Sequence, residues 1–158
     1  MKLKVLQFFT VMLFALVTGV FWGTWFSLSR SITSISPGTF LEIGHTIINN
    51  LAVPMRFLMP GAIVLSVLTM AFMPRKSTAF YFTLSGTILM IVAMIITLSV
   101  NVPIDNQIKV WTVNSLPSNW DQIRDRWESF HAVRTSVSIA GLASILIGVL
   151  TGVGENKQ

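Results

Sequence analysis

Four side chains in the last third of the sequence have types and spacing that can do chemistry together. They are Arg124, Trp127, His131 and Arg134. On an α-helix the offsets i, i+3, i+7 and i+10 place all four within about 80° of one face. Two guanidinium groups, an imidazole and an indole would then line one side of a helix that runs into an apolar segment. Ionisable groups at that depth are candidates for a functional site, and His131 is the candidate for catalysis or substrate binding.

The same face continues along the helix as a row of small residues, which predicts that it packs against other helices. That row consists of Ser138, Gly141, Gly148 and Gly152. The cations should therefore face the interior of a bundle. In the alternative interpretation the arginines bind lipid headgroups and the tryptophans anchor the helix at the interface; the residues concerned are Arg124, Arg126, Arg134, Trp120 and Trp127. The spacing Gly148-x-x-x-Gly152 fits packing within the chain or a homo-oligomer.

Arg56 is a second candidate for a buried cation. It lies between Pro54 and Pro60, whose missing backbone donors leave carbonyl groups free to accept from it. An arginine there needs a partner, which can be an anionic ligand or one of the acids Glu42, Asp105 and Glu128. The alternative is an arginine that reaches out to the membrane interface.

Both histidines stand in Glu-x-x-His motifs, Glu42/His45 and Glu128/His131. Two such motifs and two further carboxylates bind paired metal ions in soluble four-helix proteins. Only Asp105 is a further acid near enough, so the set is short by at least one ligand. We expect no cofactor and keep a metal site on Glu42, His45, Glu128 and His131 as an alternative.

The composition predicts what holds these residues in place. Of 158 residues, 53% are hydrophobic and 11% are charged, whereas a soluble domain carries about 25% charged residues. The net charge of +5 arises largely from cations beside apolar runs, which favours membrane orientation over nucleic-acid binding. Cysteine is absent, which excludes disulfides, iron–sulfur clusters and thiolate zinc sites.

Four apolar runs are long enough to span a bilayer as α-helices. They cover about residues 5–28, 51–73, 79–100 and 132–153 of one membrane domain. Lys2 and Lys4 before the first run also resemble a signal peptide, but the run is long and ends in an aromatic cluster, so we expect a retained span. The expected fold is an all-α four-helix membrane bundle.

The segments between the runs predict orientation and two further helices. Cations are dense in the short segments, at Lys2, Lys4, Arg75, Lys76 and Lys157, so both termini should be cytoplasmic, in a bacterial inner membrane. In the first long loop Thr39-x-x-Glu42 resembles a capping box that opens a short helix toward Asn50. Pro103 should end the third span. The fourth helix should run from about residue 119 to 153 and extend beyond the bilayer.

The segment from residue 101 to 134 resembles the anthrone oxygenase-like family of small four-span membrane proteins. The resemblance is carried by Asn101-x-Pro103 followed by Trp120, Arg124, Arg126-Trp127, His131 and Arg134. The family usually has N-x-P-x-N, and here Asp105 stands in place of the second Asn, with Asn106 beside it. The resemblance implies a helical bundle with a polar pocket that oxidises a phenolic or polycyclic aromatic substrate with oxygen.

Such a reaction would assign roles to the candidate residues. His131 would be the base, Arg124 and Arg134 would stabilise the anion, and Asn101 would orient an oxygen. Trp120 and Trp127 would stack on the substrate, and the binding set would be completed by Asp105, Asn106, Arg56 and His45. Three other classes stay open: a membrane binding or accessory protein that holds an anionic lipid or a partner, a small carrier or channel, and a metal-dependent oxidase.

Overall fold

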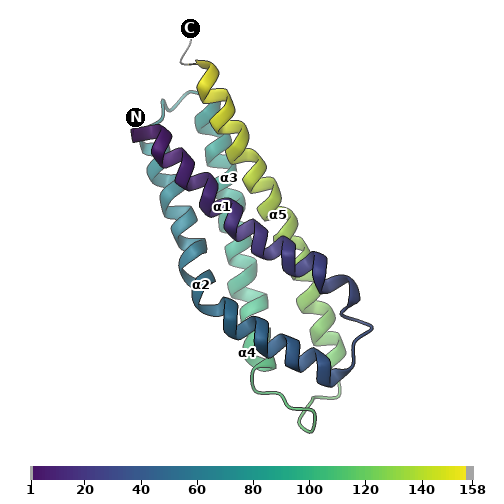
Figure 1. Ribbon diagram of the computed structural model, residues 1–158. Coiled ribbons are helices and arrows are strands. Elements are labelled where there is room, and N and C mark those ends of the chain that lie inside the picture. Colours follow the sequence, from purple (N-terminus) through teal and green to yellow (C-terminus); the bar gives the residue numbers. More distant parts are fainter. Residues whose placement is uncertain (1, 156–158) are drawn as a thin grey trace.

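The protein is a bundle of four long helices in a computed structural model that describes the backbone of residues 2–155 and the side chains of 2–29 and 31–152; Lys157 lies outside this range. The amino end of the first helix, the carboxyl end of the last and the turn between the second and third lie at one end of the bundle (Figure 1). In chain order the elements are α1 (Lys2–Ser27), the 3₁₀ turn η1 (Ser29–Ser31), α2 (Pro37–Ala71), α3 (Thr78–Ile96), the π-helical segment η2 (Thr97–Asn101), α4 (Val102–Ile108) and α5 (Trp120–Glu155).

Four helical segments are long and apolar enough to cross a membrane. They are residues 2–27, 37–71, 78–108 and 120–152. Large apolar side chains such as Phe8, Phe57 and Leu98 are exposed on the outside of the bundle, where lipid would cover them. The prediction of an all-α four-helix membrane bundle is confirmed.

Helices α3 and α5 approach closely because both carry glycine at their contact. A Cβ atom on Gly86 would lie 2.8 Å from the carbonyl oxygen of Gly141, and one on Gly148 would lie 2.9 Å from Thr83 Oγ1. Gly152 packs in the same way against Ala79. The small-residue face of α5 therefore packs within the chain, as one of the two interpretations predicted.

The first long loop differs from its prediction. Instead of a short helix and a separate span beginning at Leu51, one helix runs from Pro37 to Ala71. Its N-cap is Ser36, whose hydroxyl accepts from the Thr39 backbone N–H at 3.3 Å, so Thr39 does not cap it. Nothing between Asn50 and Leu51 interrupts the backbone hydrogen bonds, and the two segments therefore form one element.

Two prolines lie within α2, and the helix bends midway along its length (Figure 1). Pro54 and Pro60 lack a backbone N–H, and each ring crowds the carbonyl four residues earlier. Ala52, Met55 and Arg56, which surround the bend, line a cavity inside the bundle.

The prediction that Pro103 ends the third span is wrong. The chain stays helical through η2 and α4 as far as Ile108. In η2 the backbone N–H of Val102 donates to the carbonyl of Thr97, five residues earlier. This wider turn accommodates the proline that follows without breaking the helix.

Helix α5 is continuous, as predicted, and its 36 residues give it a length of roughly 54 Å. Its first turns pack against the first half of α2 and the second long loop rather than standing free. Apolar and aromatic side chains form the contact, including Ile32, Phe40, Leu41, Ile48, Ile104, Ile108, Trp111 and Trp127. This cluster covers the end of the bundle opposite the termini.

Candidate functional site

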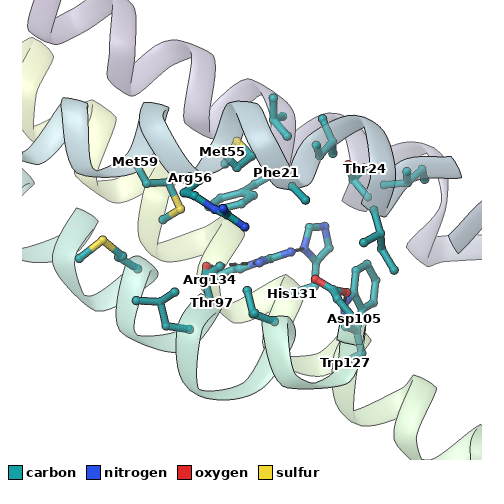
Figure 2. A pocket seen from close by; sticks show the side chains of 18 of the residues that line it. Phe21, Thr24, Met55, Arg56, Met59, Thr97, Asp105, Trp127, His131 and Arg134 are labelled. Carbon is teal, nitrogen blue, oxygen red and sulfur yellow. Dashed lines mark hydrogen bonds between the residues drawn. The ribbon is translucent and has the colours of Figure 1, made fainter. Parts of the chain in front are cut away.

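A cavity of about 460 Å³ inside the bundle is lined by residues of α1, α2, α3, η2, α4 and α5. Its volume is in the range of small-molecule binding sites, and such sites are mostly apolar with a few placed polar groups. Figure 2 shows Arg56, Asp105, His131 and Arg134 around this space. Most other lining residues are apolar, among them Val20, Phe21, Ile47, Leu51, Met55, Met59, Met94 and Val102.

Arg134 is the most constrained cation of the cavity. Its side chain is 7% exposed, and Nη1 donates to Thr97 Oγ1 of η2 at 3.2 Å. The guanidinium carbon lies 4.5 Å from the centre of the Phe21 ring of α1. Asp105 attracts the Arg134 guanidinium electrostatically but does not form an ion pair with it. The single ion pair among the described side chains joins Arg124 to Asp125. Arg134 is thus a buried charge with no carboxylate in contact.

His131 lies one turn before Arg134 and accepts its hydrogen bonds. Arg134 Nε and Nη2 are 3.0 and 2.8 Å from His131 Nδ1. A guanidinium has only donors, so Nδ1 is the acceptor, and the proton of a neutral ring sits on Nε2. That nitrogen is buried without a hydrogen-bond partner among the described residues, although the Phe21 backbone is near the ring. The imidazole thus orients Arg134.

Asp105 of α4 and Trp127 of α5 continue the cavity wall that His131 and Arg134 form. The Trp127 indole N–H donates to Asp105 Oδ1 at 2.8 Å. The face of the indole stacks on the His131 ring, with centroids 4.8 Å apart and planes 14° apart. Asp105, Trp127, His131 and Arg134 therefore form one continuous row of contacts between α4 and α5 (Figure 2).

Cations outnumber acids around the cavity. Arg56, Lys109 and Arg134 line it, whereas Asp105 is the single acidic residue among the described residues that line it. Arg56 is exposed, not buried as the sequence predicted. It reaches into the cavity from α2 (Figure 2) and makes no hydrogen bond or ion pair with the described side chains. An anion with an apolar body matches this arrangement.

Of the ten residues that the sequence placed in the site, six line the cavity. They are Arg56, Asp105, Asn106, Trp127, His131 and Arg134. The other four do not, and they are Arg124, Trp120, Asn101 and His45. The predicted face of α5 is buried as expected, but its residues lie in two different places: some line the cavity, and others belong to the cluster at the end of the bundle.

Arg124 and Trp120 belong to the cluster at the end of the bundle. Arg124 pairs with Asp125 at 2.7 Å and lies 5.0 Å over the Trp120 ring, which in turn contacts Phe40 of α2. Ten residues along a helix correspond to about 15 Å, so Arg124 and Arg134 cannot hold the same small group. The structure therefore does not place Arg124 where it would stabilise a bound anion.

Asn101 and His45 make structural contacts behind the walls. Asn101 is fully buried in η2, and its Nδ2 donates to the Trp127 backbone carbonyl at 3.1 Å, so it joins η2 to α5. His45 Nε2 is 2.8 Å from the Ile108 carbonyl oxygen, which ties α2 to the end of α4. Neither side chain reaches the cavity.

The alternative metal ligands are not gathered either. Glu42 is exposed on α2, and His45 is bound to the Ile108 carbonyl. Among the described side chains, those of residues 2–29 and 31–152, no three of His, Asp or Glu come together where they could share a metal ion. The two Glu-x-x-His motifs thus do not form one ligand set.

Two residues of the site were not predicted from the sequence. Thr97 holds Arg134 from η2, but it is one of several Ser and Thr residues in its span, and nothing in the sequence separates it from the others. Phe21 supplies the ring under Arg134, and nothing in the sequence separates it from the ten other phenylalanines.

Comparison with known proteins agrees with the resemblance carried by residues 101–134. The family model described as anthrone oxygenase matches residues 47–144. This range is more than half of the chain, and it contains every cavity residue except those of α1. No curated protein and no solved structure matches the chain. The sequence match over more than half of the chain, together with four helices long and apolar enough to cross a membrane, shows that this chain belongs to the anthrone oxygenase family.

Proposed function

We propose that the protein oxidises an acidic polycyclic aromatic substrate, held as its anion in the cavity, with dioxygen. The observation that carries the proposal is the buried guanidinium of Arg134, which faces an apolar cavity without a contacting carboxylate. A buried charge without a partner is costly, and a bound oxyanion would compensate it. The description of the matching family as anthrone oxygenase supports the class of substrate.

The reaction needs an electron-rich anion and oxygen. Loss of a proton from the methylene group of an anthrone leaves an electron pair that spreads onto the ketone oxygen. Arg134 and Arg56 would stabilise that oxyanion, as fixed cations do for developing charge. Dioxygen then oxidises the methylene carbon to a carbonyl and is itself reduced to water. The role that the sequence suggested for His131, that of the base, requires Arg134 to release Nδ1 first.

The experiment uses the purified full chain in detergent with 1,8-dihydroxy-9-anthrone as the probe. We expect oxygen uptake and quinone formation above the spontaneous rate, and loss of both in Arg134→Met. Tight binding of 1,8-dihydroxyanthraquinone with no turnover would overturn the proposal in favour of a binding or accessory protein. Activity that a chelator abolishes and a metal ion restores would favour the metal-dependent oxidase.

The position of the cavity along the bundle indicates how the substrate would enter it. The cavity is lined by the carboxyl end of α1, by α4 and by the first turns of α5, and Figure 1 shows these segments in the half of the bundle away from the termini. With the termini in the cytoplasm of a bacterial cell, as cation density suggests, it would open in the outer half of the inner membrane. Exposed lining residues such as Leu98 and Lys109 would then admit an aromatic or lipid-like ligand dissolved in the bilayer.

A further inference from the structure

The proposed function leaves open which group removes the proton, and the geometry of the cavity points to Asp105. We infer that Asp105 Oδ2 takes the proton from the substrate, while His131 positions Arg134. The inference rests on the proposed function for its substrate, but it concerns a separate step that does not require oxygen. Three observations carry it.

The first observation is that His131 has no free lone pair. Its Nδ1 accepts from two nitrogens of Arg134, at 3.0 and 2.8 Å. Because the guanidinium can only donate, the neutral ring carries its hydrogen on Nε2, and that atom is buried. Neither ring nitrogen can accept a substrate proton in this arrangement.

The second observation is that Asp105 has one oxygen held and one unused. Oδ1 accepts the Trp127 indole N–H at 2.8 Å, which fixes the plane of the carboxylate. Oδ2 accepts no hydrogen bond from the described side chains. Within the described part of the chain, Asp105 is also the single acidic residue that lines the cavity, so its Oδ2 is the available carboxylate acceptor there.

The third observation is the order of groups along the wall. The row Asp105, Trp127, His131 and Arg134 places an acceptor at one end and a fixed cation at the other. An anthrone bound along this row would present its methylene carbon and its ketone oxygen at opposite sides of its central ring. The separation of base and cation in the site matches the separation of acid C–H and oxygen in that substrate.

Asp105 Oδ2 forms a bond to hydrogen as the methylene C–H bond breaks, and the electron pair of that bond passes through the ring to the ketone oxygen near Arg134. Asp105 becomes a neutral carboxyl group. Dioxygen then forms a bond to the carbanion carbon, and Asp105 returns its proton to the resulting peroxide anion. This proton transfer restores the carboxylate, and loss of water from the hydroperoxide gives the carbonyl product.

Hydrogen exchange without oxygen tests the step by itself. The full chain and 1,8-dihydroxy-9-anthrone are mixed in D₂O under anaerobic conditions, and deuterium in the methylene group is measured by mass spectrometry. We expect the wild type to accelerate exchange, and Asp105→Asn to lose on the order of 100-fold of that acceleration. Binding of 1,8-dihydroxyanthraquinone should stay within about threefold of wild type, because Asn keeps an oxygen for the Trp127 N–H.

Two further variants separate the roles. His131→Gln offers Arg134 a side-chain oxygen and should keep most of the exchange rate. If His131 were the base, this variant would lose as much of the exchange rate as Asp105→Asn. Asp121→Asn makes the same chemical change at an exposed acid of α5 and should match wild type.

Each outcome decides something. Exchange that persists in Asp105→Asn and disappears in His131→Gln overturns the inference and leaves the oxidation intact. Exchange that depends on Asp105 without any oxygen uptake in air supports the inference and overturns the proposed oxidation. Absence of exchange in the wild type overturns the inference for this substrate, and oxygen uptake then reports on the proposed function alone.

Discussion

Arg134 directs two of its nitrogens at a single acceptor, Nδ1 of His131, one turn earlier on α5. A neutral imidazole therefore orients the guanidinium, where many buried arginines have a carboxylate. The positive charge of Arg134 is held in place without being cancelled by direct contact. This relationship explains how the cavity can keep an attraction for anions while its walls stay mostly apolar.

Removal of the Arg134 charge should weaken anion binding. For Arg134→Met we expect the affinity for 1,8-dihydroxyanthraquinone to fall about 30-fold or more, as is typical when one partner of a buried charged pair is truncated. Quenching of tryptophan fluorescence measures the affinity. Arg126→Met is the matched control because Arg126 is exposed on the same helix, and equal affinities for the two variants would refute the assignment.

Arg124 should behave differently from Arg134 despite its place on the same helical face. Its charge is already paired with Asp125 and packed over Trp120, outside the cavity. We expect Arg124→Met to bind the ligand within about twofold of wild type, since the pair is partly exposed and weak. A loss as large as that of Arg134→Met in the same titration would show that the two arginines act together.

Thr97 should contribute to binding through the orientation of Arg134. Thr97→Val keeps the shape of the side chain and removes the hydrogen bond from Nη1. A hydrogen bond to a charged group contributes about 1.5–3 kcal/mol, so we expect affinity to fall by roughly 10-fold or more. Ser99→Ala removes a hydroxyl that bonds only its own helix at Ile95 and should leave the affinity unchanged; a loss in both variants would indicate general damage to η2.

The contact between α3 and α5 should tolerate no added methyl group. In Gly86→Ala the new Cβ would meet the Gly141 carbonyl oxygen and the Ile145 side chain within 3 Å, and such overpacking costs about 1–3 kcal/mol. Gly23→Ala meets nothing within 4 Å and should stabilise α1 slightly through helix propensity. Thermal denaturation in detergent compares the two variants. A lower Tm for Gly23→Ala than for Gly86→Ala would contradict the close packing of α3 against α5.

Orientation can be tested directly because the chain has no cysteine of its own. We expect Asn114→Cys, in the loop before α5, to react with a membrane-impermeant maleimide on intact cells. Lys76→Cys, in the turn between α2 and α3, should react only after the membrane is opened. The reverse pattern would place both termini outside the cytoplasm.

The fold was accessible to sequence reasoning where a bilayer imposes it. Apolar runs of sufficient length have to be helical, so the four spans followed from hydropathy. The length of α5 followed from the absence of a helix-breaking residue between Trp120 and Gly141. One boundary failed because Pro103 was taken as a stop, and another because a short helix ending near Asn50 was separated from the span that begins at Leu51. Pro54 and Pro60 bend α2 without ending it, and Pro103 follows a π-helical turn that absorbs it. Neighbouring helices and local widening of the backbone decide such cases, and neither is written in the local sequence.

The site was predictable to the extent that one helix carries it. The spacing of Trp127, His131 and Arg134 placed them on one face, and they share one wall of the cavity. Helical periodicity gives direction but not depth, so Arg124 was grouped with Arg134 although a different set of partners surrounds it. Contacts between helices, such as Thr97 with Arg134 or Asn101 with the Trp127 carbonyl, depend on register and could not be derived from spacing.

The methionines in the cavity wall have a chemical consequence. Met55, Met59 and Met94 bring three thioether sulfurs to a chamber in which, on our proposal, oxygen is reduced. Thioethers react readily with peroxides to give polar sulfoxides. Any peroxide released during the reaction would oxidise these thioethers and make the apolar wall polar. The protein would then lose activity progressively with turnover, at a rate set by how often peroxide is released.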